Sequence, residues 1–223
     1  MSLRWLGGPQ ILRDISFSAH PGQIIGVTGS VACGKSTLGK VFIGEVPYEG
    51  SIRVSGHELS LLSEYERSKL ITYMGHQPEL MSDSIAKNIR LGKQPDIISC
   101  LRTVCLDEEV KQMPEGTATL VGNGGIRLSG GQQARTALAR TLFNAQNILI
   151  LDDPFSAVDR CTEQNIVENL RALSEDKIVL LFSHRLYLFP TFDKVLFLDN
   201  GIGIFSSHDE LMRSNAAYAE LYC

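Results

Sequence analysis

The sequence predicts an α/β fold, doubly wound around a largely parallel sheet. Continuous Val-, Ile- and Leu-rich runs recur along the 223 residues, as expected for strands that are buried on both faces of a sheet. Segments of helical period separate these runs, and strands that alternate with helices favour parallel pairing. The predicted strands are 23–28, 147–152, 177–182 and 194–198, and the predicted helices are 35–43, 132–142, 162–173 and 208–214.

Two segments depart from this alternation. Asn200-Gly201 lies between two apolar runs, and both residues tolerate positive φ, so we expect a β-hairpin over 195–206. Residues 78 to 127 are poor in strand-like runs and carry helical stretches at 82–91, 97–104 and 108–113. These stretches predict an inserted helical subdomain, in which the acidic pair Glu108-Glu109 is expected to be only a solvated helix start.

The composition is that of an ordinary folded chain, with 43% hydrophobic and 21% charged residues. The net charge of −4 and the dispersed aromatic residues argue against a nucleic-acid partner, which usually requires a basic face. No uncharged apolar run reaches the 18 residues that a membrane span needs. The five cysteines lack metal-ligand spacing and are expected to be reduced thiols.

A glycine-rich loop follows the first predicted strand and precedes the first predicted helix. It matches G-x-x-x-x-G-K-[ST], and chance would produce such a match on the order of a per cent of the time. Its backbone N–H groups and the helix N-terminus suit phosphates, Lys35 adds a positive charge, and Ser36 is placed to bind Mg²⁺. The loop therefore predicts ATP with magnesium, held by Gly29, Ser30, Val31, Ala32, Cys33, Gly34, Lys35 and Ser36, with Thr37 near the α-phosphate.

The predicted strand 147–152 ends in two acids, Asp152 and Asp153. In P-loop enzymes the first acid at such a strand end holds the Mg²⁺ shell. Taken alone, a strand that runs into an acidic turn is an equally good explanation.

The segment Leu128-Ser129-Gly130-Gly131-Gln132 decides between these readings. With the phosphate loop before it and Asp152 after it, this segment resembles the signature of the ABC (ATP-binding cassette) ATPases, and the resemblance covers essentially the whole chain. It implies a P-loop NTPase (RecA-like) core at 1–77 and 136–223, with an N-terminal antiparallel β element. It also implies that 78–135 form the α-helical signature subdomain.

Further positions resemble the motifs of this family. Trp5 corresponds to the adenine-stacking aromatic residue, Gln77 to the Q-loop glutamine that meets magnesium and water, and His184 to the switch histidine. Ser156-Ala157-Val158-Asp159 is similar to the D-loop, and 206–211 with 218–222 are similar to the ends of exporter-type cassettes.

The resemblance also implies partners. Ser129 can cap a helix so that Gly130 and Gly131 present bare N–H groups, which makes a second anion site. In the family, two cassettes pair head to tail, as a homodimer or a heterodimer, and each ATP lies between one phosphate loop and the partner's signature, here Leu128 to Gln132. The segment 80–89 would receive a coupling helix of a transmembrane domain outside this chain, at the cytoplasmic face of the membrane.

Departures from the family pattern lie close to the chemistry. Asp153 replaces the usual catalytic glutamate and is one methylene shorter, so we expect slow hydrolysis at this chain's own site, where Lys35, Gln77 and His184 would assist. Asn123, Ala32 and Ala134 also depart from the family pattern. A regulatory cassette that only binds ATP is therefore an alternative. A non-transport ABC ATPase or a P-loop phosphotransferase fits less well, and the sequence does not indicate the transported substrate.

Overall fold

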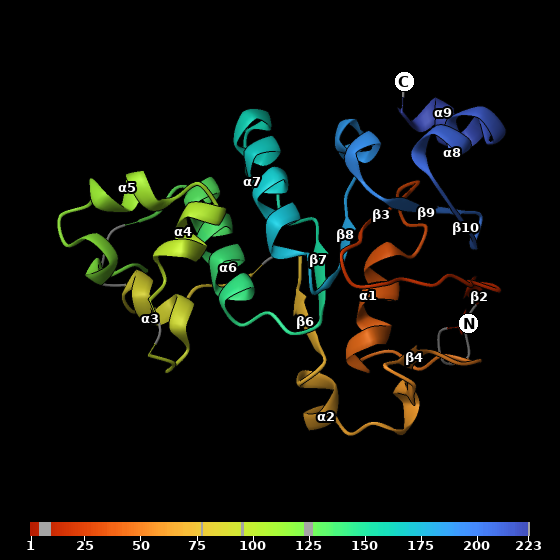
Figure 1. Ribbon diagram of the computed structural model, residues 1–223, viewed down its shortest axis with the longest axis horizontal. Helices are drawn as coiled ribbons and strands as arrows, with labels where there is room; N and C mark the ends of the chain where they lie inside the picture. The colour runs from red at the N-terminus through yellow and green to blue at the C-terminus, as the bar shows by residue number, and fades with distance from the viewer. Residues whose placement is uncertain (5–9, 77, 95, 123–126, 223) are drawn as a thin grey trace. The chain divides into compact units, whose positions relative to one another are not determined.

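The computed structural model describes residues 1–4, 10–76, 78–94, 96–122 and 127–222 (Figure 1). The chain divides into two compact units, which are described separately. The first unit comprises Met1–Tyr73, Gln146–Asp153 and Ser174–Cys223, and the second comprises Met74–Ala145 and Pro154–Leu173.

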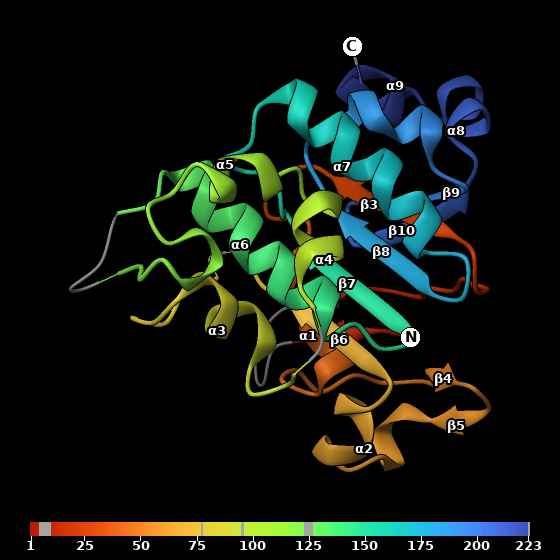
Figure 2. The ribbon, with the colours of Figure 1, turned by 60° about the vertical axis from the view of Figure 1, so that its left-hand side comes forward.

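A six-stranded sheet with the order β10-β9-β3-β8-β7-β6 organises the first unit. β3 pairs in parallel with β8 on one side and β9 on the other, and β7 pairs in parallel with β8 (Figure 2). β10 is antiparallel to β9, across the expected Asn200-Gly201 turn. The predicted α/β fold is confirmed, with strands β3 (Ile24–Gly29), β6 (Ile71–Met74), β7 (Ile148–Asp152), β8 (Ile178–Phe182), β9 (Lys194–Asp199) and β10 (Ile202–Ser206).

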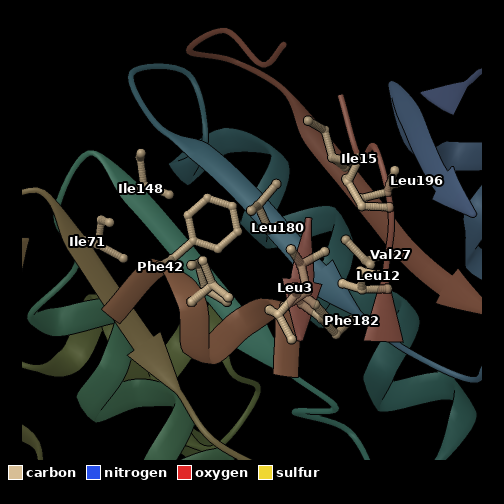
Figure 3. Close-up of a cluster of buried hydrophobic side chains, with 14 of the residues drawn as sticks. Leu3, Leu12, Ile15, Val27, Phe42, Ile71, Ile148, Leu180, Phe182 and Leu196 are labelled. Carbon is tan, nitrogen blue, oxygen red and sulfur yellow. The ribbon is translucent and has the colours of Figure 1, made fainter. Parts of the chain in front are cut away.

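One face of this sheet is covered by α1 (Lys35–Ile43) and by N-terminal segments of the chain. Phe42 of α1 lies among side chains of the central strands in Figure 3, near Leu180 of β8. Strand residues alternate between the two faces, so Leu180 and Phe182 point into this cluster. The sequence predicted the bounds of α1 correctly, because glycines flank it at both ends: Gly34 at φ 98° and Gly44 at φ 83°.

The opposite face is covered within this unit by the 3₁₀ helix η3 (Leu186–Thr191) and two C-terminal helices, α8 (His208–Ser214) and α9 (Ala216–Tyr222). A Cβ on Gly26 would lie 2.6 Å from the Phe189 ring, so this strand position has room only for glycine. Phe197 of β9 meets Tyr218 of α9 edge-on, at 5.3 Å between ring centroids.

The expected N-terminal antiparallel β element is present, since β1 (Leu3–Arg4) pairs with β2 (Gln10–Leu12) in antiparallel orientation. Other short elements of the first unit have no counterpart among the predicted ranges. They include the edge strand β6 and the antiparallel pair of β4 (Arg53–Val54) with β5 (His57–Glu58). The helical turns η1 (Leu59–Leu61) and α2 (Glu64–Ser68) follow. Segments of two to five residues are too short to show a period.

The second unit is helical. It contains α3 (Ile85–Arg90), α4 (Ile98–Thr103), α5 (Asp107–Lys111), the turn η2 (Gly116–Ala118), α6 (Gly130–Phe143) and α7 (Arg160–Leu173). α6 packs against α3 and α4, and α4 also packs against α7. Each of these α-helices overlaps a predicted helix. Their ends differ from the predicted ends by a few residues, for example where Ser84 caps the N-terminus of α3. No helix in the described part of the chain has the length and apolarity to cross a bilayer.

The C-terminal helices predict a pH dependence of stability. His208 Nδ1 lies 2.8 Å from the Tyr218 hydroxyl oxygen, and burial lowers the pKa of His208 below its usual 6.5, although Asp209 opposes the shift. The unfolded chain therefore binds more protons below about pH 6.5, so stability is present above that pH and is lost as the pH falls. The free energy of unfolding of the wild type should fall between pH 7.5 and 5.5. Because asparagine does not titrate, we expect this fall to be smaller in His208→Asn by up to about 1 kcal/mol. Urea unfolding at both pH values measures this, and equal losses in the two proteins would contradict it.

Candidate functional site

The phosphate loop curls around its own lysine. Lys35 is buried, and its Nζ donates hydrogen bonds to the carbonyl oxygens of Gly29 at 2.8 Å and Ser30 at 2.9 Å. A Cβ on Gly29 would lie 2.2 Å from the carbonyl oxygen of Leu198, so β3 must end in glycine here. Ala32, at φ 64°, adopts a left-handed backbone that glycine accepts more readily.

The helix that follows the loop has a free N-terminus. Gly34 is its N-cap residue, and no side chain caps the first turn. The first N–H groups of an α-helix have no intrahelical partner, so an anion can satisfy them, and the helix dipole favours negative charge there. Ser30, Val31, Ala32 and Ser36 are exposed, and Cys33, Gly34 and Thr37 are half-buried, so the loop is accessible to a ligand.

Asp152 faces this helix from the end of β7. It is 4% exposed, and its two carboxylate oxygens accept different hydrogen bonds. The Ser36 hydroxyl donates to Oδ1 at 3.2 Å, and the Tyr73 hydroxyl donates to Oδ2 at 3.2 Å. Burial, and then the charge of Asp152, raise the pKa of Tyr73, so the phenol stays protonated. The structure thus brings together Ser36 and Asp152, the two described residues predicted to bind metal.

Tyr73 was not among the predicted site residues. It lies on β6, 79 positions before Asp152, and its ring packs against α1, where a Cβ on Gly39 would come within 3.1 Å of it. A tyrosine in a short strand gives no local signal of such a distant contact. The glycine in the middle of α1 is the one sequence feature that hints at a bulky neighbour.

Asp153 and His184 follow adjacent strands. The N–H of Asp153 donates to the Phe182 carbonyl at 2.9 Å, and Phe182 is the last residue of β8, two positions before His184. His184 is exposed. Asp153 has φ 50°, a left-handed conformation that Asp and Asn adopt more readily than other non-glycine residues. The carboxyl ends of β3, β7 and β8 therefore carry the phosphate loop, the two acids and the histidine at one edge of the sheet.

The signature segment lies in the second unit, where it begins α6. The Ser129 hydroxyl accepts the N–H of Gln132 at 3.2 Å, and the Gln132 side chain accepts the N–H of Ser129 at 2.9 Å, a reciprocal capping box. Leu128, the residue before Ser129, is buried. Gly130 is exposed and Gly131 is half-buried, and neither has a side chain to shield its N–H group.

The D-loop segment packs against this helix N-terminus. A Cβ on Gly131 would lie 3.0 Å from the Ala157 carbonyl oxygen, and one on Gly130 would lie 3.5 Å from the Ala157 Cβ. Asp159 caps the start of α7, because its Oδ1 accepts a hydrogen bond from the N–H of Thr162 at 3.0 Å. Hydrogen bonds from Thr162 lower the pKa of Asp159. The small residues of the signature therefore also permit close packing with the D-loop.

A groove of about 780 Å³ opens beside the signature within the second unit. Its apolar lining includes Pro78 and Leu80, and its polar lining includes His76, Arg127 and Gln133. Arg140 of α6 donates to the Glu79 carbonyl at 2.8 Å, which connects the groove wall to the signature helix.

Two predicted site residues lie outside the described residues: Trp5, predicted to stack on adenine, and Gln77, predicted to bind magnesium. Asn123 also lies outside them. Among the residues that the structure describes, no group of three or more His, Cys, Asp or Glu side chains is placed to hold a metal ion.

Comparison with known proteins connects these features to one family. A family model described as "ABC transporter" matches residues 12–156. The chain is 36% identical over 220 residues to an ATP-dependent lipid A-core flippase of Burkholderia thailandensis, covering 96% of this chain and 37% of that protein. It is 34% identical to a probable multidrug resistance ABC transporter ATP-binding/permease protein, YheI, of Bacillus subtilis, covering 95% of this chain and 37% of that protein.

A solved structure agrees in fold. The chain superposes on a bacterial Atm1-family ABC exporter with ATP bound, with a TM-score of 0.91 and 28% identity, covering 99% of this chain and 40% of that one. The chain thus spans about two fifths or less of these relatives. On the family match and the fold, the chain belongs to the ABC transporter family and is an ATPase domain of it.

Proposed function

We propose that this chain powers an exporter by pairing head to tail with a second cassette around ATP. The observation that carries the proposal is that the chain has two separate helix N-termini suited to anions. One follows the phosphate loop in the first unit and the other follows Ser129 in the second unit. One ATP per chain uses the first, and the second is then available to the ATP of a partner. The relatives support export, since they include a flippase and an exporter.

In this proposal different residues bind different parts of ATP. Trp5 stacks on adenine, and residues Gly29 to Thr37 hold the phosphates, with Lys35 as the main cation. Leu128 to Gln132 close over the phosphates of the partner's ATP. Gln77 and His184 orient water and the γ-phosphate. Catalysis then depends on position and charge, as in other phosphoryl transfers.

Magnesium fits the donors that are present. The Ser36 hydroxyl and the Asp152 carboxylate are oxygen donors within hydrogen-bond distance of each other, and Mg²⁺ prefers oxygen ligands and completes its shell with phosphates and water. Gln77 would add a further oxygen. A bound metal would neutralise the charge of the β- and γ-phosphates, while Tyr73 and Ser36 hold the Asp152 carboxylate in place.

We further propose that this chain's own site hydrolyses ATP slowly. Asp153 is one methylene shorter than glutamate, so its carboxylate lies farther from the attacking water. The positive φ of Asp153 suits the shorter residue. The alternative, a regulatory cassette that binds ATP without hydrolysis, rests on the same residue.

The groove beside the signature supports a membrane partner. We propose that it accepts a coupling helix of a transmembrane domain at the cytoplasmic face, and that residues 78–135 act as the signature subdomain. The Arg140–Glu79 hydrogen bond would transmit movement from this groove to α6.

Loss of the phosphate-loop cation tests the nucleotide site. We expect Lys35→Ala to weaken ATP binding by about 10- to 100-fold, because charge-assisted hydrogen bonds contribute about 1.5–3 kcal/mol. Lys40→Ala is the matched control, because Lys40 lies on the same helix, is half exposed and pairs only weakly, with Glu45 at 3.5 Å. Fluorescent nucleotide titration measures both, and equal affinities for the two variants would refute the site.

Lengthening the acid tests slow hydrolysis. We expect Asp153→Glu to raise the ATP turnover of the assembled transporter by about 10-fold or more, since a misplacement of about 1 Å can cost ~10²-fold. Asp153→Asn, which removes the carboxylate charge, should lower turnover below that of the wild type. Unchanged or lower turnover in Asp153→Glu, at unchanged ATP affinity, would contradict the proposal.

A charge in the groove tests the membrane partner. We expect Leu80→Asp to reduce substrate-stimulated ATPase activity several-fold, because a desolvated charge costs free energy on docking. ATP affinity should stay at the wild-type value, since Leu80 belongs to the second unit and the phosphate loop belongs to the first. Full stimulation by substrate in this variant would refute docking at the groove.

A further inference from the structure

Glu109 of α5 reaches the first turn of the signature helix. Its Oε2 accepts a hydrogen bond from Gln132 Nε2 at 2.8 Å, and its Oε1 forms an ion pair with Arg135 Nη1 at 2.7 Å. The expectation that Glu108 and Glu109 form only a solvated helix start is wrong for Glu109. Its side chain is 40% exposed, whereas that of Glu108 is 75% exposed and pairs with Lys111.

The contact with Glu109 fixes which way the Gln132 amide points. Oε1 of Gln132 accepts the N–H of Ser129, which has no partner within the helix. A flipped amide would place its NH₂ group against that N–H, donor against donor. A carboxylate can only accept hydrogen bonds, so Glu109 selects the orientation in which the NH₂ group faces it and Oε1 faces Ser129.

Arg135 completes the network. Its side chain is 11% exposed, and it donates to the Cys105 carbonyl at 2.6 Å and to the Gly131 carbonyl at 3.3 Å. Burial alone would raise the pKa of Glu109, but the hydrogen bonds from Arg135 and Gln132 outweigh burial and lower it. A lone carboxylate would repel phosphate here. Because Arg135 neutralises it, the effect of Glu109 on the signature is one of position.

We propose that Glu109 is a positioning residue for the signature. It acts through Gln132 and Arg135, holds the N–H groups of Gly130 and Gly131 in the orientation that binds the phosphates of a partner's ATP, and so sets the ATP concentration at which the cassette pair closes. This inference rests on the proposed function of the signature. Glu109 itself does not contact the nucleotide.

Neutralising the two neighbouring acids separately tests the proposal in the full transporter. Glu109→Gln presents an NH₂ group to either Gln132 or Arg135, so one contact is lost, whereas Glu108→Gln leaves the network intact. We expect Glu109→Gln to raise the ATP concentration for half-maximal closure by about 10- to 100-fold, as loss of a charged hydrogen bond would. Glu109→Asp, which keeps the acceptor, should restore part of this loss. Glu108→Gln should match the wild type.

A second measurement separates positioning from a general loss of structure. ATP binding to this chain's own phosphate loop, measured in the open transporter, should be unchanged in Glu109→Gln. Wild-type closure in Glu109→Gln, or an equal weakening of binding and closure, would overturn the proposal.

Ser129→Ala distinguishes failure of the inference from failure of the proposed function. If Ser129→Ala impairs closure and Glu109→Gln does not, the positioning role alone is wrong. If both close normally, the signature does not bind the partner's ATP, and the inference is overturned together with the function on which it rests.

Discussion

The parallel pairing of β3, β8 and β7 is the constraint on which the nucleotide site depends. Parallel strands end at the same edge of a sheet, so Gly29, Asp152 and Phe182 bring their following residues to one place. The apolar strands fix this arrangement, because each is buried on both faces. The Ser36–Asp152 hydrogen bond then joins α1 to the end of β7, and Tyr73 holds the second carboxylate oxygen.

The two helix N-termini are prepared in different ways. At α1 no side chain caps the first turn, and the loop's own lysine donates to the loop carbonyls, so N–H groups remain for phosphate. At α6 a capping box satisfies the N–H groups of Ser129 and Gln132, and Glu109 and Arg135 support it from the side. The N-terminus of α1 therefore suits a phosphate that is held by the surrounding loop. The N-terminus of α6 suits a phosphate that is already bound to another chain, because its capping box makes it a rigid surface, and this agrees with a shared site.

Sequence patterns predicted the parts of the fold that rest on local signals. Gly34 and Gly44 delimit α1, Asn200-Gly201 makes the β9–β10 turn, and the apolar runs give the central strands. The two-residue strand β4 was not predicted because it is too short to show a period, although it pairs locally with β5. The strand β6 was not predicted because it lies at the edge of the sheet beside β7, far along the chain. The roles of Tyr73 and Glu109 were not predicted because their partners are distant in the sequence. Asp152 lies 79 positions from Tyr73, and Gln132 lies 23 positions from Glu109. The roles of Trp5 and Gln77 remain predictions.

The central claim is that the ATP on this chain's phosphate loop is enclosed by another cassette. An ATP-bound structure of the assembled transporter tests it most directly. We predict that signature N–H groups of the partner cassette lie within about 3.2 Å of the γ-phosphate oxygens of this ATP, while this chain's Gly130 and Gly131 face the partner's ATP. A closed, ATP-bound transporter in which each nucleotide is enclosed by one chain alone, with both signatures facing solvent, would contradict the account.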